Sequence, residues 1–238
     1  MSVVFSMPGK IGDSLLQWPI PFWFHRETGK KVTLWLDEKT LFPLKTLYEA
    51  QPGVEAVELR PGIENWTCGG QPWHFGLKTE DLIGHEDHHL GFRKFPQRQI
   101  TTEVREIAGV NLNVSGADLA ETPSLTFHVE QSKANRLILH GTGVATHSKT
   151  TPRFWKFVAS IRGELESMFD EIVFVGIQDD RETGLLTYPG WKEFDDGGDF
   201  LKLAEYMDSS RAMIGCGSSL AALAGQLKIP SIRVHDPI

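Results

Sequence analysis

The sequence has only two cysteines, no long apolar run and no excess of positive charge. Cys68 and Cys216 lie far apart in unlike surroundings, which excludes a disulfide framework and a four-cysteine zinc site. No apolar stretch approaches the roughly 20 residues that span a bilayer. A formal net charge of −7 provides no basic field for a polyanion, so nucleic acid is disfavoured as a partner.

The amino-terminal residues, MSVVFSMPGKIGD, also lack the features of a signal peptide. They have no charged start, no apolar core segment and no small-residue cleavage site. The cytoplasm is therefore the expected location.

What the sequence does contain is a regular alternation of strands and helices. Strands are predicted at 3–6, 32–36 and 54–59, and again at 136–140, 171–175, 212–214 and 230–234. Helices are predicted at 12–24, 40–50, 101–108, 151–169, 200–209 and 218–227, with an irregular insert at 60–98 and a linker at 115–124. Such alternation predicts an α/β fold with parallel sheets. We expect two Rossmann-like halves, residues 1–120 and 126–238.

The first of three glycine-rich loops, PGKIGDS at residues 8–14, joins a predicted strand to a predicted helix. In open α/β sheets ligands bind at the carboxyl ends of strands, where glycines let the backbone approach them. The G-x-x-G spacing differs from the dinucleotide-binding fingerprint. Two interpretations remain open: Gly12 and Asp13 belong to a ligand site, or Asp13 or Ser14 simply caps the helix.

The other two loops follow strands of the second half. Residues 140–150 offer glycines, the Thr142 hydroxyl and the Lys149 ammonium to phosphate oxygens, unless Lys149 is an ordinary surface lysine. Gly217, Ser218 and Ser219 lead into an alanine-rich helix and form a candidate anion-binding nest, with a purely structural tight turn as the alternative. This loop does not match the G-x-S-x-G nucleophile elbow, which argues against a serine hydrolase.

Together the three loops resemble those of the heptosyltransferase-like glycosyltransferases of family 9. PGKIGDSLL is similar to that family's amino-terminal glycine–aspartate motif, and MIGCGSSLAALAGQLKIPSIRVHDP is similar to its late donor-site segment. The glycine turn, Lys149 and the helix containing Trp155 resemble the start of its second domain. The resemblance covers roughly 1–60 and 134–238. It implies a GT-B fold, in which the two halves face each other across a cleft that holds the active site.

The resemblance also implies an activity. This is the inverting, metal-independent transfer of a hexosyl or heptosyl group from a nucleotide-diphosphate sugar to the hydroxyl of a glycan or another acceptor. Asp13 is then the general base. Gly12, Thr142, Lys149 and the amides at Gly217, Ser218 and Ser219 bind the donor and stabilise the departing diphosphate, as a metal does in other transferases. No cofactor is expected beside the nucleotide sugar.

The sequence departs from the family pattern in two places. The late motif normally begins Asp-Ser-Gly and carries a His four residues after the Ser, whereas Gly217, Ser218, Ser219 and Ala222 occupy those positions. The sequence ends at Ile238, directly after the last predicted strand, so the second half is expected to be shortened. A second class of function therefore stays open: a non-catalytic nucleotide- or sugar-binding protein that retains the fold.

A rival motif, HEDHH at residues 85–89, has the H-E-x-x-H spacing of zinc proteases. That chemistry needs His85 and His89 on one face of a stable helix, with a third ligand further on. Gly84 and Gly91 bracket the motif and no helical period surrounds it, so the sequence favours a polar loop over a zinc hydrolase.

Overall fold

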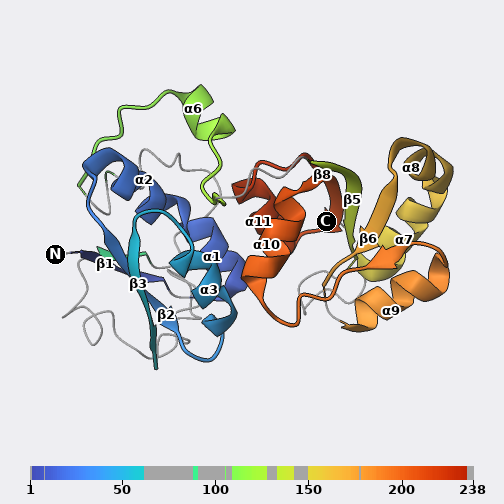
Figure 1. Ribbon diagram of the computed structural model, residues 1–238, viewed down its shortest axis with the longest axis horizontal. Coiled ribbons are helices and arrows are strands. Elements are labelled where there is room, and N and C mark those ends of the chain that lie inside the picture. The colour runs from blue at the N-terminus through green and yellow to red at the C-terminus, as the bar shows by residue number, and fades with distance from the viewer. Residues whose placement is uncertain are drawn as a thin grey trace. The chain divides into compact units, whose positions relative to one another are not determined.

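The computed structural model describes residues 2–7, 9–61, 88–90, 105, 109–127, 133–141, 150–176 and 178–234. The chain divides into two compact units, Met1–Phe127 and His128–Ile238. Each unit contains a parallel β-sheet with helices between its strands (Figure 1). None of the described helices is long and apolar enough to cross a membrane.

Unit 1 holds a four-stranded sheet of parallel pairs in the order β3-β2-β1-β4. Its strands are β1 (Val3–Met7), β2 (Val32–Asp37), β3 (Val54–Arg60) and β4 (His88–His89). Its helices are α1 (Ile11–Gln17), α2 (Pro19–Thr28), the 3-10 helix η1 (Phe42–Leu44), α3 (Lys45–Glu49) and α6 (Gly116–Glu121). The inner strands β1 and β2 are largely buried, as expected for a parallel sheet covered by helices.

Trp18, between α1 and α2, anchors both helices in the core of unit 1. It is fully buried, stacks on Tyr48 of α3 with ring centroids 5.0 Å apart, and donates its indole N–H to the Ser124 carbonyl over 2.7 Å. Pro19 follows it and begins α2, a position where the missing N–H of proline is tolerated. The predicted helix at 12–24 is therefore two helices that meet at Trp18.

Unit 2 holds a five-stranded sheet of parallel pairs in the order β7-β6-β5-β8-β9. Its strands are β5 (Ala134–His140), β6 (Glu171–Phe174), β7 (Lys192–Glu193), β8 (Ser210–Cys216) and β9 (Ser231–Val234). Its helices are α7 (Thr150–Ser160), α8 (Arg162–Met168), α9 (Gln178–Thr187), α10 (Phe200–Asp208) and α11 (Ser219–Gln226). Within this unit, α10 and α11 cover one face of the sheet, and α7 and α8 cover the other (Figure 1).

Phe174, the last residue of β6, is the centre of an aromatic cluster in unit 2. Its ring lies 5.5 Å from Trp155, 5.7 Å from Trp191 and 6.3 Å from Tyr188, measured between centroids. A Cβ on Gly184 of α9 would come within 2.7 Å of the Phe174 ring, so α9 approaches the sheet closely only because glycine stands there.

The remaining differences from the sequence-based prediction are local. The helix predicted at 151–169 is interrupted at Ile161 and forms α7 and α8. The predicted linker at 115–124 contains α6, whose N-cap Ser115 accepts the Asp118 N–H over 3.0 Å. Helix α9 and strand β7 were not predicted. Of the predicted helix at 101–108 only Arg105 lies within the described residues, and most of the irregular insert at 60–98 lies outside them.

Candidate functional site

In each sheet the chain winds away from one central strand in both directions. In unit 1 the chain runs from β1 to β2 and β3 on one side of β1, while β4 pairs on its other side. In unit 2 it runs from β5 to β6 and β7, and then returns to place β8 on the other side of β5. Ligands of open α/β sheets bind outside the carboxyl ends of strands at such switch points. The topology therefore singles out the segments after β1, β5 and β8.

The segment after β1 holds Asp13 in a confined place. Asp13 is the third residue of α1, and its Oδ2 accepts the backbone N–H of Lys10 over 3.0 Å. Lys10 is the N-cap residue, and Asp13 at the third helical position forms a capping box with it, so the alternative that Asp13 helps to cap the helix is supported although neither Asp13 nor Ser14 occupies the N-cap position itself. Gly9 has a φ of +106°, and a Cβ on it would lie 2.8 Å from the Asp13 Cβ. Only glycine fits the backbone position beside Asp13.

The environment of Asp13 favours its use as a base. The residue is half-buried, and burial raises the pKa of its carboxyl group, against the opposing effects of the Lys10 N–H and the Lys10 charge. A carboxylate with a raised pKa takes up a proton more readily at neutral pH. Gly12 precedes Asp13 in the first turn of α1 and is also half-buried.

Ser14, the residue after Asp13, helps to hold α1 in position. Ser14 is fully buried, and its hydroxyl forms a hydrogen bond of 3.1 Å with the hydroxyl of Tyr48, which is also fully buried. Burial raises the pKa of the Tyr48 phenol, so the phenol stays neutral. Because Tyr48 also stacks on Trp18, one face of α1 is held by tertiary packing while Asp13 lies at its start. The role of Ser14 is therefore structural.

The segment after β8 leads into α11 at the switch point of unit 2. Gly217, Ser218 and Ser219 are half-buried, and Ser218 immediately precedes the helix in an extended backbone conformation. The Ser218 Oγ is buried and forms no hydrogen bond within the described part of the chain. The first N–H groups of a helix also lack partners within the helix. These amides and the Ser218 hydroxyl together suit an anionic group.

His140 and Cys216 join the strand ends around the same switch point. His140, the last residue of β5, is 5% exposed, and its Nδ1 lies 3.2 Å from the Val175 carbonyl oxygen beyond β6. Gly176 follows with a φ of +118°, and a Cβ on it would come within 2.7 Å of the His140 ring. The Cys216 thiol at the end of β8 donates to the Gly141 carbonyl over 3.2 Å. The carboxyl ends of β5, β6 and β8 are thus tied together.

Arg181 of α9 was not identified from the sequence. Although it is only 7% exposed, its Nη1 donates to Asp195 Oδ1 over 2.9 Å and to the Gly176 carbonyl over 3.3 Å. Its Nε lies 3.4 Å from a Glu193 carboxylate oxygen. This buried guanidinium fastens α9 and the segment after β7 to the end of β6. A lone Arg inside a polar sequence gives no signal for such a role.

Several predicted site residues lie outside the described residues: Thr142, Lys149 and His85. His88 and His89 form strand β4, which pairs with β1, so the helix that the zinc motif requires is not formed at its second histidine. Among the described residues, no group of three or more His, Cys, Asp or Glu side chains is placed to hold a metal ion.

Comparison with known proteins gives a clear result only at the level of structure. No protein-family model matches the sequence, and no curated protein sequence matches it significantly. The solved structure of the E. coli heptosyltransferase WaaC with ADP-2-deoxy-2-fluoro heptose matches with a TM-score of 0.68 at 12% identity, covering 100% of this chain and 90% of WaaC.

Two further structures agree with this match. The E. coli ADP-heptose lps heptosyltransferase II matches with a TM-score of 0.61 at 11% identity, over 98% of this chain and 84% of its own. A glycosyl transferase of family 9 from Veillonella parvula matches with a TM-score of 0.57 at 12% identity, over 98% and 79%. The chain therefore has the GT-B-like α/β fold that heptosyltransferases share with this family 9 glycosyltransferase.

Proposed function

We propose that this chain is a glycosyltransferase that moves a sugar from a nucleotide-diphosphate sugar to an acceptor hydroxyl, with inversion and without a metal ion. The observation that carries the proposal is the setting of Asp13. It lies after the first strand at the switch point of unit 1, it is held by the Lys10 N–H, and burial raises its pKa. The heptosyltransferase fold supports the same reaction class.

In the proposed reaction Asp13 accepts the proton of the acceptor hydroxyl as the hydroxyl oxygen attacks the anomeric carbon. A new carbon–oxygen bond forms on one face of the sugar while the bond to the diphosphate breaks on the other. The diphosphate leaves with the bonding electron pair, and the anomeric configuration inverts. A positioned base of this kind contributes roughly 10²–10⁴-fold to the rate.

The diphosphate charge that develops requires hydrogen-bond donors in a fixed arrangement. We assign this role to the amides at Gly217, Ser218 and Ser219 and to the buried Ser218 hydroxyl. Thr142 and Lys149 are proposed for the same role from the sequence resemblance alone. Since three of the matching heptosyltransferase structures contain ADP or an ADP-sugar, ADP-linked sugars are the first donors to test.

The first experiment is a thermal-shift screen of ADP-, GDP- and UDP-linked sugars. A ligand that binds only the folded chain stabilises it by about 2.7 kcal/mol when its free concentration is 100 times Kd. We expect one nucleotide class to raise Tm and Ser218→Ala to reduce that rise. Ser167→Ala, an exposed serine on α8, serves as the matched control and should leave the rise unchanged.

The second experiment separates an enzyme from a binding protein. Asp13→Asn keeps an oxygen for the Lys10 N–H but removes the base, so it should retain the nucleotide-induced rise in Tm and lose transfer by roughly 10²–10⁴-fold. A nucleotide shift without transfer by the wild-type chain to any acceptor would favour the non-catalytic alternative. No shift with any nucleotide sugar would contradict the proposal.

A further inference from the structure

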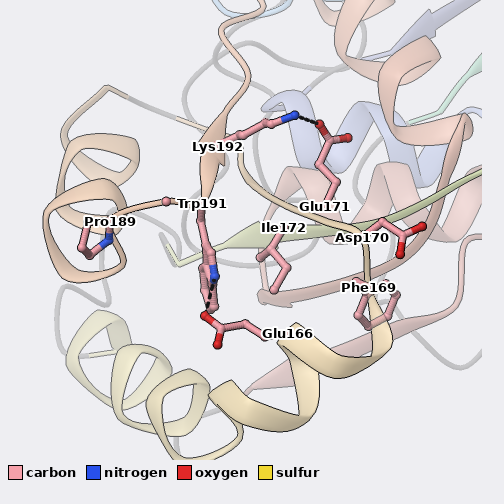
Figure 2. A pocket seen from close by; sticks show the side chains of 9 residues that line it. Glu166, Phe169, Asp170, Glu171, Ile172, Pro189, Trp191 and Lys192 are labelled. Carbon is pink, nitrogen blue, oxygen red and sulfur yellow. Dashed lines mark hydrogen bonds and ion pairs between the residues drawn. The ribbon is translucent and has the colours of Figure 1, made fainter.

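A polar pocket lies in unit 2, at the end of the sheet opposite to the switch-point loops of that unit. Its volume is about 270 Å³, and Figure 2 shows the side chains that line it. Glu171 is the first residue of β6 and Lys192 the first of β7, so the pocket is at the amino ends of these strands. The proposed donor loop, in contrast, follows the carboxyl end of β8.

One wall of the pocket is an indole ring with a fixed orientation. Trp191 stacks on Tyr188 with ring centroids 4.4 Å apart and an interplanar angle of 6°. Its Nε1–H donates to Glu166 Oε1 over 3.0 Å, and Arg162 donates to the same oxygen over 2.8 Å. Figure 2 shows the indole and the Glu166 carboxylate meeting at the α8 side of the pocket. This wall is therefore organised before any ligand arrives.

The opposite wall is held by an ion network. Glu171 accepts a hydrogen bond from Lys192 Nζ over 2.7 Å through Oε1, and it pairs with Arg136 through Oε2. Arg136 is itself stacked over the Tyr206 ring at 4.0 Å. The charge of each lining glutamate is thus balanced by a neighbouring cation. These two carboxylates therefore add no net charge that would select a cationic ligand, and Asp170, which is exposed, is the lining carboxylate without a cation partner among the described residues.

What remains available in the pocket is a set of hydrogen-bond acceptors beside apolar surface. Within the described residues, the Asp170 carboxylate and the second oxygen of Glu166 form no hydrogen bond or ion pair, and both side chains are exposed. Phe169, Ile172 and Pro189 also line the pocket and contribute apolar atoms to it. The fixed indole ring can pack against the C–H groups on one face of a ligand, and the carboxylate oxygens can accept hydrogen bonds from its hydroxyl groups. A neutral ligand that carries both kinds of group therefore suits this pocket.

We propose that this pocket binds a single pyranose ring of a carbohydrate, with one ring face on Trp191 and hydroxyls donating to Asp170 and Glu166. Drug-sized ligands occupy pockets of roughly 300–1,000 Å³, so a volume of about 270 Å³ fits one sugar ring better than an oligosaccharide. The site is separate from the proposed donor loop, and its existence does not depend on transferase activity. Within unit 2, a glycan bound there would lie at the end of the sheet opposite to the proposed donor loop.

The test is saturation-transfer difference NMR of the full chain with a panel of methyl pyranosides. We expect saturable binding of at least one of them, weakened about tenfold or more in Asp170→Ala and abolished in Trp191→Ala. The exposed Asp170 carboxylate forms no hydrogen bond or ion pair within the described part of the chain, so its variant should keep the wild-type Tm even if Trp191→Ala does not. Glu164→Ala, an exposed carboxylate on α8 outside the pocket, is the matched control and should bind as the wild type does.

Competition with nucleotide sugars distinguishes this proposal from the proposed function. Pyranoside binding should persist at a nucleotide-sugar concentration that saturates the thermal shift, and Asp170→Ala should leave that shift unchanged. The proposal is overturned if no pyranoside binds, if Asp170→Ala binds as tightly as Glu164→Ala, or if the nucleotide sugar displaces the pyranoside. None of these outcomes alters the result of the donor screen.

Discussion

Replacing Gly9 with alanine tests whether the position of Asp13 matters for chemistry. A Cβ on Gly9 would lie 2.8 Å from the Asp13 Cβ and 3.0 Å from its Oδ2. Non-bonded carbons pack at about 3.5–4.0 Å, so the carboxylate must move by roughly 1 Å. A misplacement of about 1 Å in a catalytic arrangement reduces the rate on the order of 10²-fold. We therefore expect Gly9→Ala to lose transfer activity on this scale.

The same substitution also has a cost in stability. At a φ of +106° a residue with a Cβ is strained by about 1–3 kcal/mol. For a chain of this size each kcal/mol lowers Tm by roughly 2–4 °C. Differential scanning fluorimetry should therefore show a fall of roughly 2–12 °C in Gly9→Ala, while the chain remains folded at the assay temperature.

Gly29→Ala is the matched control. Gly29 ends α2 with a φ of +68°, and a Cβ on it would meet no atom within 4 Å. This variant should show backbone strain without any movement of Asp13, so its transfer rate should equal that of the wild type. Equal transfer rates for Gly9→Ala and Gly29→Ala would refute the reasoning that places Asp13 at the reacting atoms.

Two further predictions concern stability. Since the raised pKa of Asp13 means that the folded chain binds this proton more tightly than the unfolded chain, stability falls as pH rises above the unfolded pKa, about 3.9. Asp13→Asn should therefore raise Tm at pH 7, and this gain in Tm should disappear below about pH 3, where Asp13 is protonated in both states. Thermal unfolding measured across this pH range tests the prediction, and a lowered Tm of Asp13→Asn at pH 7 would contradict it. Tyr48→Phe leaves the buried Ser14 hydroxyl without its partner and should destabilise unit 1 by about 1–3 kcal/mol in urea unfolding. Adding Ser14→Ala should recover part of this loss, whereas strictly additive effects would show that the two hydroxyls are not coupled.

The strands and the glycine turns were predictable because their signals are local. These strands are short runs rich in apolar residues, and glycines mark several of the turns that follow them. The confirmed positions of β1, β2, β3, β5, β6, β8 and β9 all rest on such runs. The break at Trp18 was missed, because the apolar spacing over 12–24 continues past it, although Pro19 and Pro21 restrict where a helix can continue.

The contacts that give the site its character were not predictable, because they join distant residues. Ser14 meets Tyr48 across 34 positions, and nothing near either residue predicts the pair. Arg181 reaches Asp195 across a strand that is only two residues long, too short to produce a pattern. The pocket beside Trp191 likewise depends on the packing of α8 against the start of β6. Tertiary packing, rather than local preference, decides all three.

The two switch points affect how the ligand specificity of such a protein can change during evolution. Their location is a property of strand order, which depends on many buried residues spread over the strands and helices of each unit. The chemistry offered at each point depends on a handful of residues in one loop, such as Gly217, Ser218 and Ser219. Loop substitutions can therefore alter which molecule is recognised while the binding place stays where the winding of the chain puts it. In proteins that share this fold, the location of the binding site is therefore expected to change less than the identity of the ligand.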